Sequence, residues 1–528
     1  MWLFLFVGLA SANGDNCITS VLPHPTTLKT GTDIAVLSQP FSFSLAGGET
    51  PPPVLARAFA RYKSLIFKHD SGSSSSGSSN FGARLAQLTI SLESSDHHLS
   101  PDINETYTLS VDSGAAALAA ATVTGVLRGL ETFSQLVLSS SSTQCSAVKQ
   151  GAFVIPNVPI AITDSPRFPH RGLLLDTSRS FFPITDIKRQ LDGMSFVKMN
   201  VFHWHITDSQ SFPIESKTYP DLSGKGAYSS SQTYSPSDVT AVVEYAKDRG
   251  IRVVPEFDTP GHTTSWGKAF PDIVVCPNKQ PWSSYCNEPP CGQLDPTNNQ
   301  TYDVMSGLFA EMAALFPDPY FHLGSDEVNF NCWESDAGIQ KYMKDNNKTA
   351  NNLLQDFEAR VQAIVGPLNK TVLHWEEVIT SFKLDIPKDN VIQVWLGESS
   401  VKPITEQGYK VVASPYQAWY LDCGTGSWIT GGKSWCDPYK TWTDVYSYDP
   451  TAGLSAAQAS LVIGGEVALW SETIDRSNVD TKAWPRTAAA AERLWSSAPS
   501  ISTPAAALPR AVGHAYSTSV VQNQPWEL

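Results

Sequence analysis

Two adjacent carboxylates, Asp326 and Glu327, are the residues of this chain whose type and position best suit chemistry. They follow a short apolar run, 320–323, and the flexible Gly324, so we expect them at the end of a strand. Breaking a glycosidic bond needs a carboxyl group that protonates the leaving oxygen and a negative charge near the positive centre that develops. Neighbouring side chains cannot flank a bond from opposite faces, so a conventional pair of acid and nucleophile is not predicted.

Polar and aromatic residues also follow seven other short apolar runs. They are Asp176 and Arg179; His203, Trp204, His205 and Asp208; Glu256, Asp258 and His262; Trp375, Glu376 and Glu377; Trp395; Tyr416 to Asp422; and Glu466, Trp470 and Glu472. Strand alternation would place His203 and His205 on one face, as in a metal site, but no third ligand is evident and we expect structural roles. Such clusters predict one site built from many strand ends.

Eight apolar runs must position these clusters. They cover residues 172–175, 200–203, 252–255, 320–323, 372–375, 391–395, 410–413 and 461–465. Helical patterns at 238–249, 302–315 and 352–365 lie between them, which is typical of parallel strands joined by crossover helices. The sequence therefore predicts an α/β fold with a (β/α)8 TIM barrel, whose site lies at the C-terminal ends of the strands.

The residues before the barrel predict a smaller α+β domain. It contains a helical stretch at 55–67, strands at 85–92 and 107–111, and an alanine-rich helix that ends at Leu136; a Ser/Gly tract at 70–80 should form a surface loop. A turn-rich phrase at 162–168 marks the boundary. We expect a signal peptide at 1–12, an N-terminal α+β domain at 13–163 and the barrel at 164–528.

Several features are typical of the secretory pathway. Residues 1–12 form an apolar run that ends in Ala-Ser-Ala, as at a signal-peptidase site. The eight cysteines lack C-x-x-C spacing, which favours disulfides over a metal site. The sequence leaves their connectivity open, but plausible pairs are Cys276 with Cys332, Cys286 with Cys291, Cys423 with Cys436 and, by elimination, Cys17 with Cys145. Glycosylation sequons lie at Asn104, Asn299, Asn347 and Asn369.

Composition narrows the class of partner. The net charge of −14 at pH 7 disfavours nucleic acid and anionic membrane surfaces. No apolar stretch after the N-terminus approaches the length of about 18 residues that spans a bilayer, so no stable membrane insertion is expected. The 15 tryptophans indicate a large aromatic core or stacking surfaces for a flat ligand such as a sugar.

The residues around the two carboxylates resemble a known family. The string HLGSDEVNFNCW at 322–333 closely resembles the catalytic signature of glycoside hydrolase family 20, the β-N-acetylhexosaminidases, of the eukaryotic, plant-like secretory type. Further matching strings lie in order at 168–179, 199–216, 253–267, 391–395, 464–472 and 484–495. Ser325 stands where the family more commonly has a second glycine. The N-terminal domain resembles the family's smaller domain only loosely.

The resemblance implies a role for each site residue. Glu327 would be the general acid and then the general base. Asp326 and Tyr420 would hold the substrate's own acetamido group, which attacks the anomeric carbon to form an oxazolinium ion. This explains the missing nucleophile, because the family is an exception to the two-carboxylate scheme. Asp208 and His262 would support the acid. The residues implied to bind the terminal sugar are Arg179, Trp375, Trp395, Asp422, Trp470 and Glu472.

The expected activity is that of a retaining exo-β-N-acetylhexosaminidase that removes terminal GlcNAc or GalNAc from N-glycans or chito-oligosaccharides, with no metal and no cofactor. Neither Leu396-Gly397 after Trp395 nor Cys423 after Asp422 supplies the Arg and Glu with which one animal lysosomal subunit of the family handles charged sugars, so we expect a neutral sugar. The enzyme would act outside the cell, in the cell wall, or in a vacuole or lysosome. A homodimer is expected only by analogy.

Two other interpretations stay open. One is a catalytically silent sugar-binding protein on the same barrel, although the acid is present. The other is an exo-glycosidase that uses Glu327 together with a separate carboxylate such as Glu256 or Glu376. A thiazoline mimic of the oxazolinium ion should bind tightly only to a substrate-assisted enzyme.

Overall fold

The computed structural model describes residues 20–67, 84–139, 152–429, 432–497, 503–505 and 507. The expected signal peptide, the Ser/Gly tract at 70–80, and Cys17 and Cys145 lie outside these residues.

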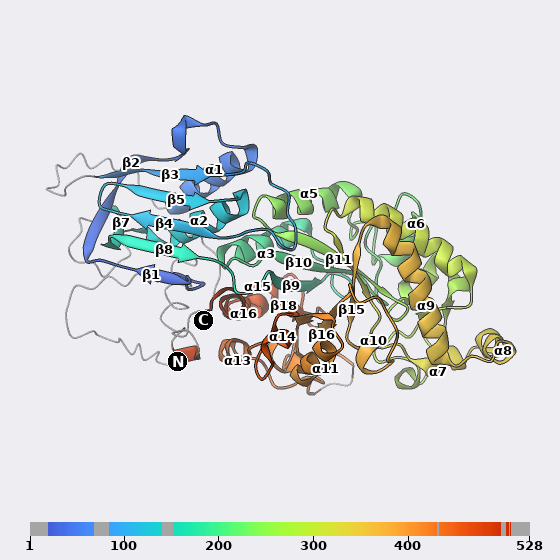
Figure 1. Cartoon of the computed structure of the whole chain (residues 1–528). Helices are drawn as coiled ribbons and strands as arrows, with labels where there is room; N and C mark the ends of the chain where they lie inside the picture. Colours follow the sequence, from blue (N-terminus) through green and yellow to red (C-terminus); the bar gives the residue numbers. More distant parts are fainter. Residues whose placement is uncertain are drawn as a thin grey trace, which may run out of the picture.

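The N-terminal part is an eight-stranded sheet with two helices packed on it, drawn from blue to teal in Figure 1. The helices are α1 (Pro53–Ile66) and α2 (Val123–Leu136). In sheet order the strands are β1 (Thr27–Lys29), β8 (Ile160–Asp164), β4 (Tyr107–Val111), β5 (Ala116–Ala120), β3 (Leu85–Leu92), β2 (Asp33–Leu45), β7 (Phe153–Val158) and β6 (Leu138–Ser139). Strands β4, β5 and β8 bury every second residue, so one face of the sheet forms the core of this domain.

Eight parallel strands close into a barrel, which confirms the predicted fold class. In chain order they are β9 (His170–Asp176), β10 (Val201–Thr207), β11 (Arg252–Thr259), β14 (Tyr320–Gly324), β15 (Thr371–Trp375), β16 (Val391–Val394), β17 (Lys410–Ala413) and β18 (Val462–Leu469). Every residue of β9, β10 and β11 is buried, as in strands covered on both faces. None of the helices among the described residues is long and apolar enough to cross a membrane.

Helices pack around the barrel and begin where the sequence supplies caps. The longer ones are α3 (Ile184–Phe196), α5 (Pro236–Lys247), α6 (Asn299–Leu315), α9 (Ala350–Val365) and α16 (Arg486–Trp495). Ser235 and Asp238 form a capping box at the start of α5, and Thr349 and Asn352 form another at α9. Each box satisfies backbone N–H groups that would otherwise lack partners, so these helix starts are fixed locally.

The small domain docks on the end of the barrel where the strands begin. Glu105, just before β4, pairs with Arg171 of β9 and with Arg128 of α2, each at 2.7 Å and fully buried. Arg128 also donates to the backbone carbonyls of Arg249 and Gly250, just ahead of β11. The opposite end of the barrel, where the strands finish, is therefore left open for a site.

Candidate active site

The loop after β14 carries Asp326 and Glu327. Gly324 ends the strand at φ +71°, and a Cβ at this position would overlap the carboxylate of Asp258, so the turn requires glycine. Ser325 and Glu327 also have positive φ values, 71° and 53°. A non-glycine residue in this region costs about 1–3 kcal/mol, and such residues cluster at functional sites. The turn directs both carboxyl groups into one pocket.

A pocket of about 450 Å³ opens at the C-terminal ends of the strands. Its volume lies within the range of small-molecule sites. The site residues proposed from the sequence that line it are Arg179, His262, Asp326, Glu327, Trp395, Tyr420, Asp422, Trp470 and Glu472. The other two lie behind its wall. Asp208 is buried against His262, and the ring of Trp375 packs 5.9 Å from the ring of Trp470.

His262 connects the proposed acid to a buried carboxylate. Its Nδ1 lies 3.1 Å from Asp208 Oδ1, and its Nε2 lies 3.2 Å from Glu327 Oε2. Burial would lower the pKa of His262, but the charges of Asp208 and Asp258 raise it well above its usual value. The imidazolium can therefore donate to both carboxyl groups, which fixes the direction of the Glu327 side chain.

Asp326 is buried beside Glu327. Burial raises the pKa of Asp326 to about 6; the charge of His262 opposes this shift and the charge of Glu327 adds to it. Asp258, just behind, has a pKa raised well above its usual value by burial and by the charge of Asp326. Asp258 and Asp326 share a hydrogen bond, and the Asp326 carboxylate lines the pocket. A carboxylate at a pocket wall suits an N–H group of a ligand.

Aromatic rings form the walls of the pocket near Asp326. Trp395 stacks on Tyr420 with ring centroids 6.1 Å apart and planes 9° apart, and Trp470 lies 6.2 Å from Tyr420. The N–H of Trp375 donates to Glu256 and that of Trp395 donates to Glu377, both at 2.8 Å. These bonds fix both rings. Trp395 lines the pocket, where it can contact apolar groups of a ligand, and Trp375 supports Trp470 from behind.

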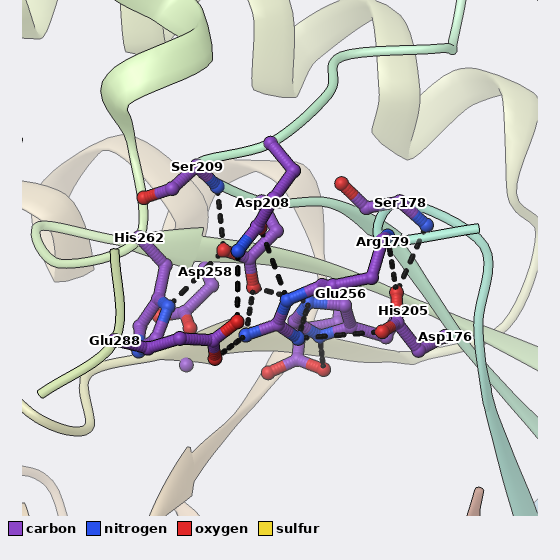
Figure 2. Close-up of polar contacts among 12 residues, drawn as sticks. Asp176, Ser178, Arg179, His205, Asp208, Ser209, Glu256, Asp258, His262 and Glu288 are labelled. Atoms are coloured by element: carbon purple, nitrogen blue, oxygen red, sulfur yellow. Dashed lines mark hydrogen bonds and ion pairs between the residues drawn. The ribbon is translucent and has the colours of Figure 1, made fainter. Parts of the chain in front are cut away.

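Arg179 lies at the polar side of the pocket among three carboxylates (Figure 2). Its Nη2 lies 2.8 Å from both Asp208 and Glu288, and its Nη1 lies 3.5 Å from Asp176. Burial raises the pKa of Glu288 to about 7 against the charge of Arg179. Glu288 was not predicted from the sequence, because it follows no strand. Its one signal was the short Cys286-to-Cys291 loop that carries it.

Three of the expected disulfides form, Cys276–Cys332, Cys286–Cys291 and Cys423–Cys436. The third closes a loop that carries Trp435, which is 65% exposed and lies 5.8 Å from the ring of Trp395. Trp282 and Trp428 also line the pocket. None of these three tryptophans was predicted from the sequence, because they lie in loops whose course depends on the disulfides and not on strand order.

The carboxylates suggested as separate nucleophiles do not line the pocket. Glu256 is fully buried and accepts from His205 and Trp375. Glu376 is also buried, and it accepts from the backbone N–H groups of Trp395 and Leu396. Neither can reach the anomeric carbon of a sugar in the pocket, which argues against this mechanism.

The chain is similar to known proteins over most of its length. Residues 168–498 match the model described as glycosyl hydrolase family 20, catalytic domain, and residues 21–136 match the one described as beta-acetyl hexosaminidase like. The chain is 39% identical to beta-hexosaminidase subunit beta of Felis catus, with 94% of this chain and 90% of the relative covered. It is 38% identical to beta-hexosaminidase 1 of Arabidopsis thaliana, with 91% and 85% covered. The structure matches the chitobiase of Flavobacterium johnsoniae with a TM-score of 0.79 and 29% identity, covering 95% of this chain and 73% of that one.

Proposed function

The chain belongs to glycosyl hydrolase family 20 and is a β-N-acetylhexosaminidase, and we propose that it is a retaining exo-enzyme that uses substrate-assisted catalysis. The observation that carries this mechanism is the Asp326 carboxylate in the pocket lining, beside Glu327 and next to the aromatic walls. An acetamido group has an N–H for this carboxylate and a methyl group for the rings, so the arrangement suits a substrate that supplies its own nucleophile.

In the first step Glu327 gives its proton to the glycosidic oxygen. The acetamido carbonyl oxygen attacks the anomeric carbon as the bond to the leaving group breaks. Asp326 accepts the amide N–H and balances the charge of the oxazolinium ion, while the hydroxyl of Tyr420 donates to the acetamido oxygen. Glu327 then takes a proton from the water molecule that attacks the anomeric carbon and opens the oxazolinium ring, so the β configuration is retained. His262, held by Asp208, keeps Glu327 in position.

The inner end of the pocket suits the hydroxyl groups of one terminal sugar. Arg179 can donate to them, and burial, with the charge of Glu288, raises the pKa of Glu472 to about 8, so its carboxyl group can also donate. Asp422 lies beside Glu472 in the pocket lining. A lining rich in carboxyl groups disfavours anionic sugars. We therefore propose neutral terminal GlcNAc or GalNAc, on N-glycans or chito-oligosaccharides, as the substrate class.

We further propose a place in the secretory pathway. The disulfides fit an oxidising compartment, and all four sequon asparagines are exposed. Cell fractionation distinguishes the extracellular space or cell wall from a vacuole or lysosome. Size-exclusion chromatography with light scattering tests the homodimer.

The proposed function is tested with an aryl β-N-acetylglucosaminide beside the aryl β-glucoside. The wild type should hydrolyse only the acetamido sugar, and Glu327→Gln should lower kcat by about 10²- to 10⁴-fold. A thiazoline analogue of the oxazolinium ion should inhibit competitively. Comparable activity on the glucoside, with no inhibition by the thiazoline, would support the two-carboxylate mechanism. No activity on either sugar would support the silent sugar-binding protein.

A further inference from the structure

One buried carboxylate, Glu256 of β11, contacts residues that support two different parts of the pocket, without lining it. Its Oε2 pairs with His205 Nδ1 at 2.5 Å and lies 3.1 Å from His203 Nε2. Its Oε1 accepts from Trp375 Nε1 at 2.8 Å. The two oxygens of one carboxylate therefore face two different parts of the site.

The Oε2 side leads to the acid. His205 Nε2 lies 2.9 Å from Asp208 Oδ2, and Figure 2 shows His205 between Glu256 and Asp208. The other oxygen of Asp208 contacts His262, which contacts Glu327. Carboxylates and imidazoles thus alternate without a gap from the interior of the barrel to the proton donor.

The Oε1 side leads to the acetamido wall. Trp375 is 1% exposed, and its ring packs against His203 and Trp470. The indole N–H is the only hydrogen-bond donor of this side chain, so its bond to Glu256 fixes the rotation of the ring. A change at Glu256 would let the indole turn and would loosen Trp470, which packs on Trp375 and lines the pocket.

Charged and titratable groups surround Glu256 on three strands. They are His203 and His205 on β10, Asp258 on β11 itself, and His322 on β14, whose Nδ1 lies 3.2 Å from Oε1. Burial opposes ionisation of Glu256, but His205 and His322 hold its pKa well below the usual value. Burial would likewise lower the pKa of His205, yet Glu256 raises it to about 10. Glu256 and His205 thus form an ion pair across acidic and neutral pH.

We propose that Glu256 is a positioning residue that couples the proton donor Glu327 to the acetamido wall at Trp375. The inference rests on the proposed function. Substrate-assisted catalysis needs a proton on one side of the anomeric carbon and the acetamido oxygen on the other at the same moment. One rigid carboxylate that holds both His205 and Trp375 keeps the distance between the proton donor and the acetamido wall constant. A misplacement of about 1 Å in such an arrangement can cost 10²-fold in rate.

The test compares Glu256→Gln with His205→Gln by kcat/KM against pH. Glu256→Gln removes the negative charge at the inner end of this line of carboxylates and imidazoles, so the line becomes more positive and the alkaline limb should move to lower pH. His205→Gln removes a positive charge from the same line, so the limb should move to higher pH. Glu256→Gln should also lower kcat about 10- to 100-fold and weaken binding of the thiazoline analogue several-fold.

Asp318→Asn is the matched control. Asp318 is also buried, and it pairs with Arg252 at the other end of β11 at 3.2 Å, but it contacts neither Trp375 nor the support of the acid. It should lower stability and leave both limbs of the profile in place. Opposite shifts of the alkaline limb in Glu256→Gln and His205→Gln support the coupling. If Glu256→Gln does not fold, the shift in His205→Gln alone decides between coupling and a structural role.

The inference is overturned if the wild type is active and the test variants keep its pH profile, or if Glu256→Gln binds the thiazoline as tightly as the wild type does. Glu256 would then have only a structural role. An inactive wild type would instead contradict the proposed function, so the two failures can be told apart.

Discussion

Asp326 and Glu327 are neighbours in sequence but have different surroundings. Glu327 receives a hydrogen bond from the His262 imidazolium, whereas Asp326 is more deeply buried and lies 3.9 Å from the same nitrogen. The same dipeptide can therefore supply a proton donor and an anion. This division of roles comes from the turn at Gly324 and from the His262 imidazolium beside Glu327. Neither feature could be predicted from the Asp-Glu dipeptide alone.

This division predicts the acid limb of the pH profile. Because burial raises the pKa of Asp326 to about 6, the anion that balances the oxazolinium charge is lost as the pH falls through about 6. The acid limb of kcat/KM for an aryl β-N-acetylglucosaminide should thus lie well above pH 4, the range of an ordinary carboxyl group. Asp326→Asn should lose this limb together with about 10²- to 10³-fold of kcat. A wild-type limb near pH 4 would contradict the assignment.

At the scale of the element, the end of β14 depends on one glycine. Gly324→Ala should remove most of the activity and lower stability, because the new methyl group overlaps Asp258 and the αL conformation costs about 1–2 kcal/mol more. Gly408→Ala is the control, since Gly408 also has positive φ, +87°, but open space around it. Urea unfolding and kcat should separate the variants. Equal losses of stability and kcat in Gly324→Ala and Gly408→Ala would mean that the clash at Gly324 is relieved by movement of the loop.

The loop closed by Cys423–Cys436 predicts where a second sugar binds. Trp435→Ala should raise KM for a chito-oligosaccharide several-fold, because an aromatic face that packs on a partner contributes about 0.5–1.5 kcal/mol. Inhibition by free GlcNAc, which needs only the inner pocket, should be unchanged. Initial rates with the oligosaccharide measure KM, and an equal loss of affinity for the free sugar would show that Trp435 shapes the inner pocket instead.

The strands and the residues at their ends were predictable, but the loops were not. Short apolar runs that alternate with helical patterns give the barrel, and the barrel rule then places Asp326 and Tyr420 at one face. Glu288 and Trp435 lie on loops whose course depends on disulfides and packing over long sequence separations. Glu256 was visible as a polar residue directly after the third apolar run, but only closure of the barrel shows that it points inward and cannot act as a nucleophile.

At the scale of the whole molecule, chemistry and docking of the small domain occupy opposite ends of the barrel. The pocket lies where the strands finish, and the buried contacts of Glu105 with Arg171 and Arg128 lie where they begin. Burial would raise the pKa of Glu105, but the two arginines lower it below 4.5. The contribution of Glu105 to stability is therefore complete above about pH 4.5 and lost only as the pH falls further, so the contact persists in a mildly acidic compartment.

This separation predicts that the two domains can be loosened without touching the chemistry. Glu105→Gln leaves Arg171 and Arg128 buried without their anion, which should lower the free energy of unfolding by about 3–5 kcal/mol. Arg57→Ala is the control, because Arg57 also links the two domains, through Asp248 at 2.6 Å, but is 55% exposed and should cost no more than about 1 kcal/mol. Urea unfolding followed by tryptophan fluorescence measures both variants. In the folded state each should keep the kcat of the wild type, and a fall in kcat for Glu105→Gln at full folding would show that the docking end does influence the pocket.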